Sequence, residues 1–137
     1  MEGFSQGGTC VSQFVTGHPE LFGSGIAILS QPGPTLGDEA STVARGFDGS
    51  RADYEAAQPA AMMRAKAPYR DTMLVFGTGS LDQRFTGYAR TLHDEALAAG
   101  IDSRLIIAPT GHSWHTVQTV FEQALPLIAD RMGIGGA

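Results

Sequence analysis

The sequence contains little charge, a single cysteine and no long hydrophobic run, and each of these shortages excludes a class of protein. Charged residues make up 17% of the 137 residues, compared with about 25% in an average globular domain. The 14 acidic and 9 basic side chains give a net charge of −5, and the basic residues form no cluster. We therefore expect no nucleic-acid partner and no anionic membrane partner, because a negatively charged chain is repelled by both.

The sequence contains neither a pattern typical of a membrane span nor one typical of a secretion signal. Its apolar runs, such as residues 73–76 and 105–108, span about four residues, whereas a transmembrane helix needs about 20. Residues 1–5 provide neither a positively charged region nor an apolar stretch, so we expect no secretion signal and no membrane span in this chain. Cys10 stands alone and cannot form an internal disulfide, which leaves the redox compartment and the localisation open.

The remaining composition is that of a globular domain. Glycine (18) and proline (7) are fewer than in low-complexity chains, and 42% of the residues are hydrophobic, which is near the globular norm. Short runs rich in Ile, Leu and Val predict strands that are buried on both faces, at residues 25–30, 73–77 and 103–109. Helical patterns lie between and after these runs. This alternation predicts an α/β fold with a short parallel sheet of about three strands, flanked by helices.

The first predicted helix follows Ser5 and is expected to end at Gly17. Cys10 lies about 140° around this helix from Ser5, at 3.6 residues per turn. That angle favours a cysteine that faces the core over a cysteine that serves as a thiol nucleophile. The apolar face of the helix is expected to consist of Cys10, Val11, Phe14 and Val15.

Two further helical stripes are clear in the second half of the chain. Apolar residues at offsets of three and four predict one helix over residues 85–99, with Gly100 as a left-handed cap. A second stripe predicts a helix over residues 117–128. Pro126 is expected to kink or restart that helix, because proline lacks the N–H and clashes one turn back.

Residues 31–68 differ from the rest of the chain in being rich in glycine and proline. Short helical pieces are expected near residues 38–44 and 51–57, and Ser50 with Asp53 is typical of a capping box for the second piece. The segment is predicted to be either a lid over a site or an ordinary helical crossover between two strands.

Residues 3–7 read Gly-Phe-Ser-Gln-Gly, the GxSxG pattern, and Gly8 extends it. In a nucleophile elbow the serine occupies a strained turn between a strand and a helix, and small residues two positions before and after it let the two backbones pass closely. The pattern therefore predicts Ser5 as a nucleophile. The alternative is a serine whose hydroxyl only caps the helix that follows.

A serine hydroxyl becomes nucleophilic when a histidine accepts its proton, and the histidine needs a carboxylate to fix its tautomer. Asp82 after the second predicted strand and His112 after the third supply both, in the chain order expected of α/β-hydrolases. The carboxyl ends of parallel strands lie along one edge of a sheet, so we expect Ser5, Asp82 and His112 to meet there. The alternatives are an Asp82 that only caps a helix and a solvated His112 in a surface loop.

Three short motifs together resemble a known group of enzymes. They are GFSQGG at residues 3–8, GSLD at residues 79–82 and GHSW at residues 111–114. They are similar to the esterase family of α/β-hydrolases that includes enterochelin esterases, feruloyl esterases, esterase D and the actinobacterial mycolyltransferases. The resemblance covers nearly the whole chain but only the C-terminal half of that family's domain. Residues 1–137 are therefore expected to form the C-terminal portion of an α/β-hydrolase domain.

The resemblance implies Ser5 as nucleophile, Asp82 as acid and His112 as base, acting on a small-molecule ester or acyl substrate through an acyl-enzyme, with no cofactor. A full domain of this type has several strands before the nucleophile and a loop that donates a second oxyanion N–H. We expect both to be absent here, which leaves the backbone N–H of Gln6 as oxyanion donor and residues 25–30 as an open apolar edge. The expected protein is a truncated ester hydrolase or acyltransferase, or else a non-catalytic remnant that self-associates through that edge.

Other interpretations concern residues close to these motifs. His115 forms an HxxH pair with His112, but no third ligand lies close in sequence, so we expect no metal. Residues 77–79 resemble part of a dinucleotide-binding fingerprint. Asp82 stands where the third glycine belongs, so the close helix packing would be lost, and this is the least favoured of the functions considered. Trp114 either packs the start of the last helix or walls the pocket, and we predict it as a substrate-binding residue.

Overall fold

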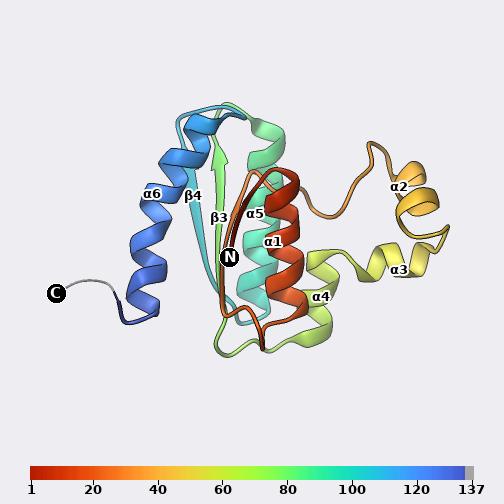
Figure 1. Ribbon diagram of the computed structural model, residues 1–137, viewed down its shortest axis with the longest axis horizontal. Helices are drawn as coiled ribbons and strands as arrows, with labels where there is room; N and C mark the ends of the chain where they lie inside the picture. Colours follow the sequence, from red (N-terminus) through yellow and green to blue (C-terminus); the bar gives the residue numbers. More distant parts are fainter. Residues whose placement is uncertain (135–137) are drawn as a thin grey trace.

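The computed structural model describes residues 1–134, which form a parallel sheet with helices on both faces (Figure 1). The sheet has the order β1-β2-β3-β4, and every neighbouring pair is parallel. Its strands are β1 (Glu2–Phe4), β2 (Ser24–Ile28), β3 (Met73–Gly79) and β4 (Asp102–Ala108). This arrangement confirms the predicted α/β fold.

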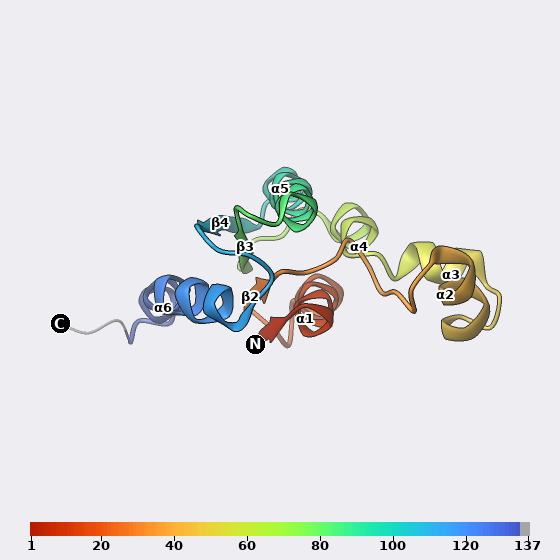
Figure 2. The same cartoon turned by 90° about the horizontal axis from the view of Figure 1, so that it is seen from above.

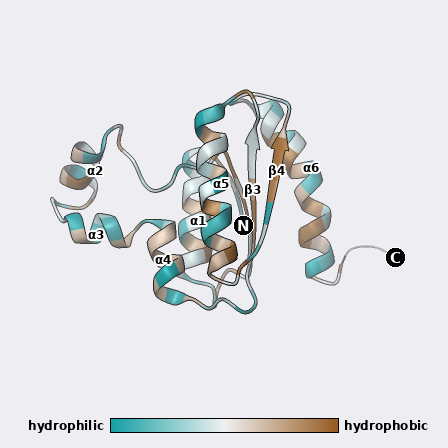
Figure 3. Cartoon of the chain, turned by 180° about the vertical axis from the view of Figure 1, so that it is seen from behind, coloured by the Kyte–Doolittle hydropathy of each residue, from teal (hydrophilic) through white to brown (hydrophobic). Residues whose placement is uncertain are grey.

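The helices complete the alternation expected from the sequence. They are α1 (Gln6–Gly17), α2 (Glu39–Gly46), α3 (Arg51–Ala56), α4 (Pro59–Lys66), α5 (Gln83–Ala98) and α6 (Trp114–Arg131). Seen from above, α6 covers one face of the sheet, and α1 and α5 cover the other (Figure 2). Hydrophobic colour is strong on β4, and hydrophilic patches lie on the outer surfaces of the helices (Figure 3).

Side chains that point alternately to the two faces of the sheet divide the core into two layers. Ile26 and Ile28 of β2 and Val75 of β3 pack in the cluster that contains Val120 of α6. The residues next to these in the strands point to the other face. They are Ala27, Leu74 and Phe76, and they pack in the second cluster with side chains of α1 and α5. Successive side chains of a strand point to opposite faces, so a continuous apolar run is what a sheet covered on both sides requires.

The sheet has four strands, not the three predicted, and residues 25–30 are not its edge. Glu2, Gly3 and Phe4 pair with Ile26, Ala27 and Ile28, so β1 is the edge strand beside β2. A strand of three residues is too short to produce a detectable alternation pattern. The prediction of an open apolar edge at residues 25–30 was therefore wrong.

Helix α1 buries part of the predicted apolar face, because Val11 and Val15 are buried as expected. Phe14 is 47% exposed and Cys10 is partly exposed, whereas Thr9, Ser12 and Thr16 are completely buried. The buried hydroxyls bond back to their own helix, as in the 3.2 Å bond from Ser12 Oγ to the carbonyl of Gly8. Small polar residues with internal partners can therefore face the sheet, and the prediction was wrong for Phe14 and Cys10 only.

Several helix boundaries agree with the predicted signals, and one does not. Helix α1 ends at Gly17, Gly100 has a positive φ of 87°, and the Ser50 hydroxyl accepts a hydrogen bond from the backbone N–H of Asp53 at 3.2 Å. Helix α6, however, continues through Pro126 and does not restart there. Pro126 and Glu122, one turn earlier, are both exposed, so water can satisfy the carbonyl that loses its helical partner.

The connection between β2 and β3, which contains α2, α3 and α4, has two parts. Helix α4 packs against α1 and α5, whereas α2 packs mainly on α3, and α3 packs on α2 and α4. Figures 1 and 2 show α2 and α3 projecting to one side of the molecule, away from the sheet. The crossover interpretation therefore describes α2 and α3 better than a lid over the sheet edge.

We predict that Gly77→Ala lowers the free energy of unfolding by about 1–3 kcal/mol, because overpacking a close-packed core forces side chains and backbone to shift. A Cβ atom at position 77 would collide with the side chain of Val120. Gly87→Ala is the control, since nothing lies within 4 Å of its added Cβ; it should stabilise α5 by about 0.5–1 kcal/mol. Urea unfolding of both variants checks this, and a Gly77→Ala protein as stable as the parent contradicts the packing described.

Candidate active site

The three residues singled out by the sequence lie after three strands of the same parallel sheet. Ser5 follows β1 directly, Asp82 lies three residues after β3, and His112 lies four residues after β4. Because all four strands are parallel, these positions share the carboxyl edge of the sheet. This edge is where ligands bind in open α/β sheets.

Ser5 occupies a strained backbone conformation between β1 and α1. Its φ of 54° and ψ of −117° lie in a region that side chains other than glycine rarely adopt, at a cost of about 1–3 kcal/mol. The backbone N–H of Ser5 donates to the carbonyl of Ile28 at 2.8 Å, which ties the turn to β2. The Ser5 hydroxyl makes no capping hydrogen bond to α1, so the interpretation of Ser5 as a hydroxyl cap is wrong.

The glycines around Ser5 let three backbones pass closely. A Cβ atom on Gly3 would collide with the carbonyl of Gly7, and one on Gly8 would lie 2.6 Å from the carbonyl of Ile28. Nothing lies within 4 Å of a Cβ atom built on Gly7. A side chain is therefore sterically excluded at Gly3 and Gly8, whereas position 7 has room for one.

Asp82 uses its two carboxylate oxygens for different partners. Oδ1 accepts a hydrogen bond from the backbone N–H of Phe85 at 3.2 Å, which caps the start of α5. Oδ2 lies 3.3 Å from Nδ1 of His112. The capping interpretation and the predicted contact with histidine thus both hold for Asp82, and the cap fixes the direction in which the second oxygen points.

His112 is held between two phenyl rings. Its ring centroid lies 4.6 Å from that of Phe85 in an edge-on arrangement and 5.5 Å from that of Phe4. The His112 side chain is 34% exposed and that of Asp82 is 21% exposed. With Nδ1 turned toward Asp82, the nitrogen left for another partner is Nε2.

Phe4 connects the histidine to the serine turn, because Phe4 is the residue that precedes Ser5. Among the residues that the structure describes, no hydrogen bond joins the Ser5 hydroxyl to the His112 ring. Asp82 and His112 are therefore in contact, and Ser5 is linked to them through the neighbouring phenyl ring. Serine–histidine hydrogen bonds are often long in enzymes without substrate.

Phe4 and Phe85 are the two site residues that the sequence analysis missed. A usable signal existed, because Phe4 is adjacent to the predicted nucleophile and Phe85 occupies the third position of the helix that Asp82 caps. Position 4, at the end of β1, and position 85, in the first turn of α5, lie at the site whatever residue occupies them.

The loops that carry Asp82 and His112 contact each other through their backbones. The N–H of Ser80 donates to the carbonyl of Ala108 at 2.8 Å, and the N–H of Leu81 donates to that of Thr110 at 3.0 Å. A Cβ atom on Gly79 would collide with the carbonyl of Thr110. Only glycine at position 79 allows this approach, which brings Asp82 to His112.

Thr116, a buried residue of α6, fixes the loop that carries His112. Its hydroxyl donates to the carbonyl of Gly111 and lies 2.6 Å from the hydroxyl of Thr110. Thr110 and Gly111 immediately precede His112. The side chain of Thr116 therefore clamps both residues that lead into the histidine.

The backbone N–H of Gln6 belongs to the first residue of α1. The first N–H groups of a helix lack carbonyl partners within it, and they stabilise an anion that binds at the N-terminal end of the helix. The oxyanion donor predicted from the sequence is thus a helix N-terminal N–H, on the residue that follows Ser5.

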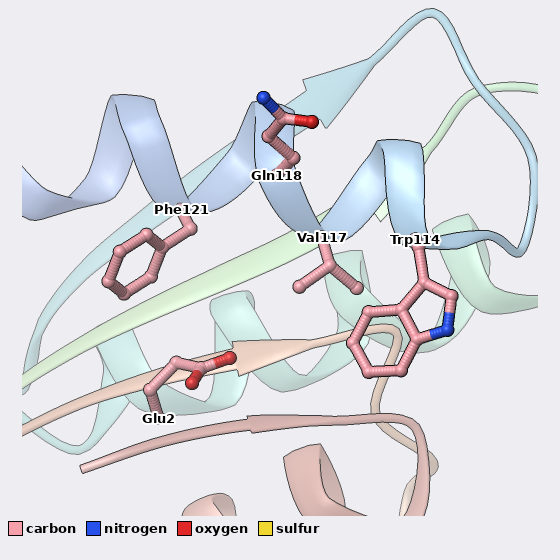
Figure 4. Close-up of a pocket in the computed structure, with 5 residues that line it drawn as sticks. All are labelled: Glu2, Trp114, Val117, Gln118 and Phe121. Atoms are coloured by element: carbon pink, nitrogen blue, oxygen red, sulfur yellow. The ribbon is translucent and has the colours of Figure 1, made fainter.

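Trp114 lines a shallow groove of about 420 Å³ between β1 and α6 (Figure 4). Glu2 extends from β1, and Val117, Gln118 and Phe121 come from α6. Trp114 is 73% exposed, and its ring lies 5.0 Å from that of Phe4. Trp114 therefore both contacts Phe4 and lines a surface groove, and its role in substrate binding stays a prediction.

The remaining histidines and the candidate metal pair have simpler surroundings. His93 Nδ1 lies 2.7 Å from the hydroxyl of Ser103, and His18 Nδ1 lies 3.3 Å from Glu20. His115 is exposed. Within residues 1–134, no group of three or more His, Cys, Asp and Glu side chains is arranged to hold a metal ion.

No family model matches the chain, but solved structures do. A ferulic acid esterase superposes with a TM-score of 0.73 at 14% identity, over 95% of this chain and 50% of that one. A carboxylesterase from Mesorhizobium loti gives 0.55 at 16% identity, over 90% and 47%. A post-proline cleaving enzyme from Rickettsia typhi gives 0.69 at 17% identity, over 98% and 21%. The chain has part of the α/β-hydrolase fold.

The chain spans about half the length of the matched esterases. In sequence, it is 28% identical to an uncharacterized protein of Corynebacterium glutamicum, over 96% of this chain and 32% of that protein. In the part of the chain that the structure describes, no helix is both long enough and apolar enough to span a bilayer.

We predict that Thr116→Val releases the His112 loop and lowers the free energy of unfolding by about 1–3 kcal/mol, because the carbonyl of Gly111 loses its donor. Thr119→Val, at a partly exposed position of the same helix, is the matched control and should change little. The readouts are urea unfolding and the nuclear Overhauser effect between the Phe85 and His112 rings. An unchanged ring contact in a Thr116→Val protein of parental stability contradicts the proposed clamp.

Proposed function

We propose that this chain carries the catalytic residues of a serine-dependent carboxylic ester hydrolase or acyltransferase. The observation that supports the proposal most strongly is the 3.3 Å contact between Asp82 Oδ2 and His112 Nδ1. It lies at the sheet edge where the strained Ser5 presents a hydroxyl that does not cap its own helix. The ferulic acid esterase and the carboxylesterase share the fold, and the activities in their names agree with the proposal.

In the first half of the proposed reaction, Nε2 of His112 accepts the proton of the Ser5 hydroxyl as Oγ attacks the ester carbonyl. Asp82 keeps the other ring proton on Nδ1 and stabilises the imidazolium that forms. The negative oxygen of the tetrahedral intermediate accepts a hydrogen bond from the Gln6 N–H. Collapse of the intermediate breaks the ester C–O bond, and His112 returns its proton to the departing alcohol.

In the second half, water or another hydroxyl compound attacks the acyl-Ser5 ester while His112 accepts its proton. The second tetrahedral intermediate expels Ser5 Oγ, which recovers a proton from His112. The product is a carboxylic acid when water attacks and a new ester when an alcohol attacks. The proposed residues are the same for hydrolysis and acyl transfer.

The two phenyl rings give His112 a defined orientation in this scheme. Phe85 and Phe4 both lie against the ring and restrict its rotation away from Asp82. A histidine held in one orientation loses less conformational entropy in the transition state than a freely rotating one.

We predict that the protein reacts covalently with a fluorophosphonate probe and that Ser5→Ala abolishes the labelling, because Ser5 Oγ is the atom that attacks phosphorus. His112→Ala should slow the labelling by about 10²–10⁴-fold, the usual contribution of a general base. Gel fluorescence after timed probe addition measures both rates, and circular dichroism checks that each variant is folded.

Ser80→Ala is the matched control for this experiment. Ser80 is an exposed serine on the same edge of the sheet, two residues before Asp82, and its replacement should leave the labelling rate unchanged. Labelling that persists in Ser5→Ala, or no labelling of the folded parent protein, would refute the assignment of Ser5.

A second candidate function is association through the free edge of β1. The outer side of an edge strand presents unpaired backbone groups that can bind another strand, and the exposed Trp114 lies in the groove beside it. Among the strands of residues 1–134, β1 pairs with β2 and with no other strand. We infer self-association through this edge from these two features.

This second candidate predicts a concentration-dependent dimer in sedimentation velocity. Trp114→Ser should weaken the dimer, because it removes the largest apolar side chain of the groove. Leu97→Ser is the matched control, since Leu97 is 50% exposed on α5, outside the groove. A parent protein that sediments as a monomer at all concentrations contradicts the association.

A further inference from the structure

A cleft of about 160 Å³ with polar walls lies between the link that joins β2 to α2 and the first half of α5. Seen from above, this link passes between α1 on one side and α5 on the other (Figure 2). The walls of the cleft are formed by residues 31–35, Tyr54, Gln58, Arg84 and Tyr88. They supply one guanidinium, two phenols and amide groups.

The cleft is connected to the residues of the proposed active site along α5 and through hydrogen bonds. Arg84 lies two residues after Asp82, in the first turn of α5. Gln31 donates its backbone N–H to the hydroxyl of Thr9 at 3.0 Å, and the backbone N–H of Thr9 donates to the carbonyl of Ser5 at 3.1 Å. Two hydrogen bonds therefore connect the rim of the cleft with the serine.

Arg84 carries a positive charge that no close carboxylate neutralises. Arg51, Arg64, Arg104 and Arg131 each lie within 4 Å of a carboxylate oxygen, whereas the exposed Arg45, Arg70, Arg84 and Arg90 have no such neighbour among residues 1–134. In residues 1–134, Arg84 forms no such ion pair, although Asp82 is close enough to add a favourable charge interaction. Asp82 directs its own oxygens to Phe85 and His112.

Tyr88 holds the guanidinium in place. Nε of Arg84 donates to the Tyr88 hydroxyl at 2.9 Å, and the guanidinium carbon lies 5.7 Å from the centre of the Tyr88 ring. The Nη groups remain as donors. A guanidinium oriented by one bond and still offering planar N–H donors matches the geometry of a carboxylate.

The opposite wall of the cleft is closely packed. Gln58 Nε2 donates to the carbonyl of Tyr54 at 3.0 Å, and the Gln58 amide lies directly against Gly33, where a Cβ atom would collide with it. The amide is therefore fixed on one side of an open cleft of about 160 Å³, with the exposed Arg84 on the other. A space of this size accommodates a small group rather than a long acyl chain.

We propose that this cleft binds a carboxylate of the ester substrate, so that the substrate is an acidic ester with its charged group seated on Arg84. This inference rests on the proposed function of Ser5, Asp82 and His112. It adds the substrate class, which neither the motifs nor the esterase-like fold specifies. The carboxylate belongs to the acyl half or to the alcohol half of the ester.

The test compares two pairs of esters. In one pair the charge is in the acyl half (4-nitrophenyl hemisuccinate against 4-nitrophenyl butyrate), and in the other it is in the alcohol half (4-acetoxybenzoate against phenyl acetate). We expect Arg84→Gln to lower the charged-to-neutral ratio of kcat/KM about tenfold in one pair, since it removes a charged hydrogen bond. Ratios cancel any general effect of the substitution on Ser5 or His112.

Arg90→Gln is the matched control, because Arg90 is an exposed arginine of α5 outside the cleft and its replacement changes the net charge equally. The ratio should stay at the parental value in this variant. If the protein hydrolyses the esters and Arg84→Gln changes the charged-to-neutral ratio of kcat/KM in neither pair, the assignment of the cleft is overturned. The proposed function then remains intact.

A binding measurement separates the two proposals when turnover is missing. Calorimetry with the Ser5→Ala variant and 4-nitrophenyl hemisuccinate or 4-acetoxybenzoate reports binding without hydrolysis. Binding that requires Arg84, in a protein whose parent hydrolyses none of the four esters, supports the cleft and overturns the proposed hydrolysis. Absence of both turnover and binding overturns both proposals.

Discussion

The contact between the loops that follow β3 and β4 is the constraint on which the candidate site depends. Gly79 meets the carbonyl of Thr110 so closely that no side chain fits between them, and backbone hydrogen bonds from Ser80 and Leu81 join the two loops. This contact sets the separation of Asp82 and His112. Two side chains that are 30 positions apart in sequence thereby meet at 3.3 Å without any long-range ion pair having to draw the loops together.

The same site combines rigid support with local strain. Ser5 holds an unfavourable φ of 54°, and the strain persists because its N–H is bonded to β2 and because glycine at positions 3 and 8 allows the close approach of β1, α1 and β2. The histidine is held differently, by two phenyl rings and by the clamp of Thr116 on its loop. Under the proposed function, these two features would hold the nucleophile and the base in fixed positions.

Much of this arrangement could be predicted from the sequence, because it is encoded in strong local patterns. Three apolar runs identified β2, β3 and β4, and the order of Ser5, Asp82 and His112 along a parallel sheet placed them on one edge. The predicted Ser50 cap and the left-handed Gly100 follow from local chemistry that tertiary packing leaves unchanged.

The rest required the fold, for three physical reasons. Strand β1 has three residues, too few for periodicity, and its pairing with β2 is visible only in space. The buried face of α1 carries Thr9, Ser12 and Thr16, whose hydroxyls find partners within the helix. Phe4, Phe85 and Arg84 are ordinary residues in sequence, and they acquire meaning because turns carry them beside His112 or into a cleft.

The most direct test of the central claim is a crystal structure of the protein that measures the distance between Ser5 Oγ and His112 Nε2. The account predicts a separation near hydrogen-bond length, about 2.6–3.2 Å when tightened by a bound ester analogue, with Asp82 still in contact with Nδ1. An imidazole turned away from Ser5, with its contact to Asp82 lost, would contradict the account.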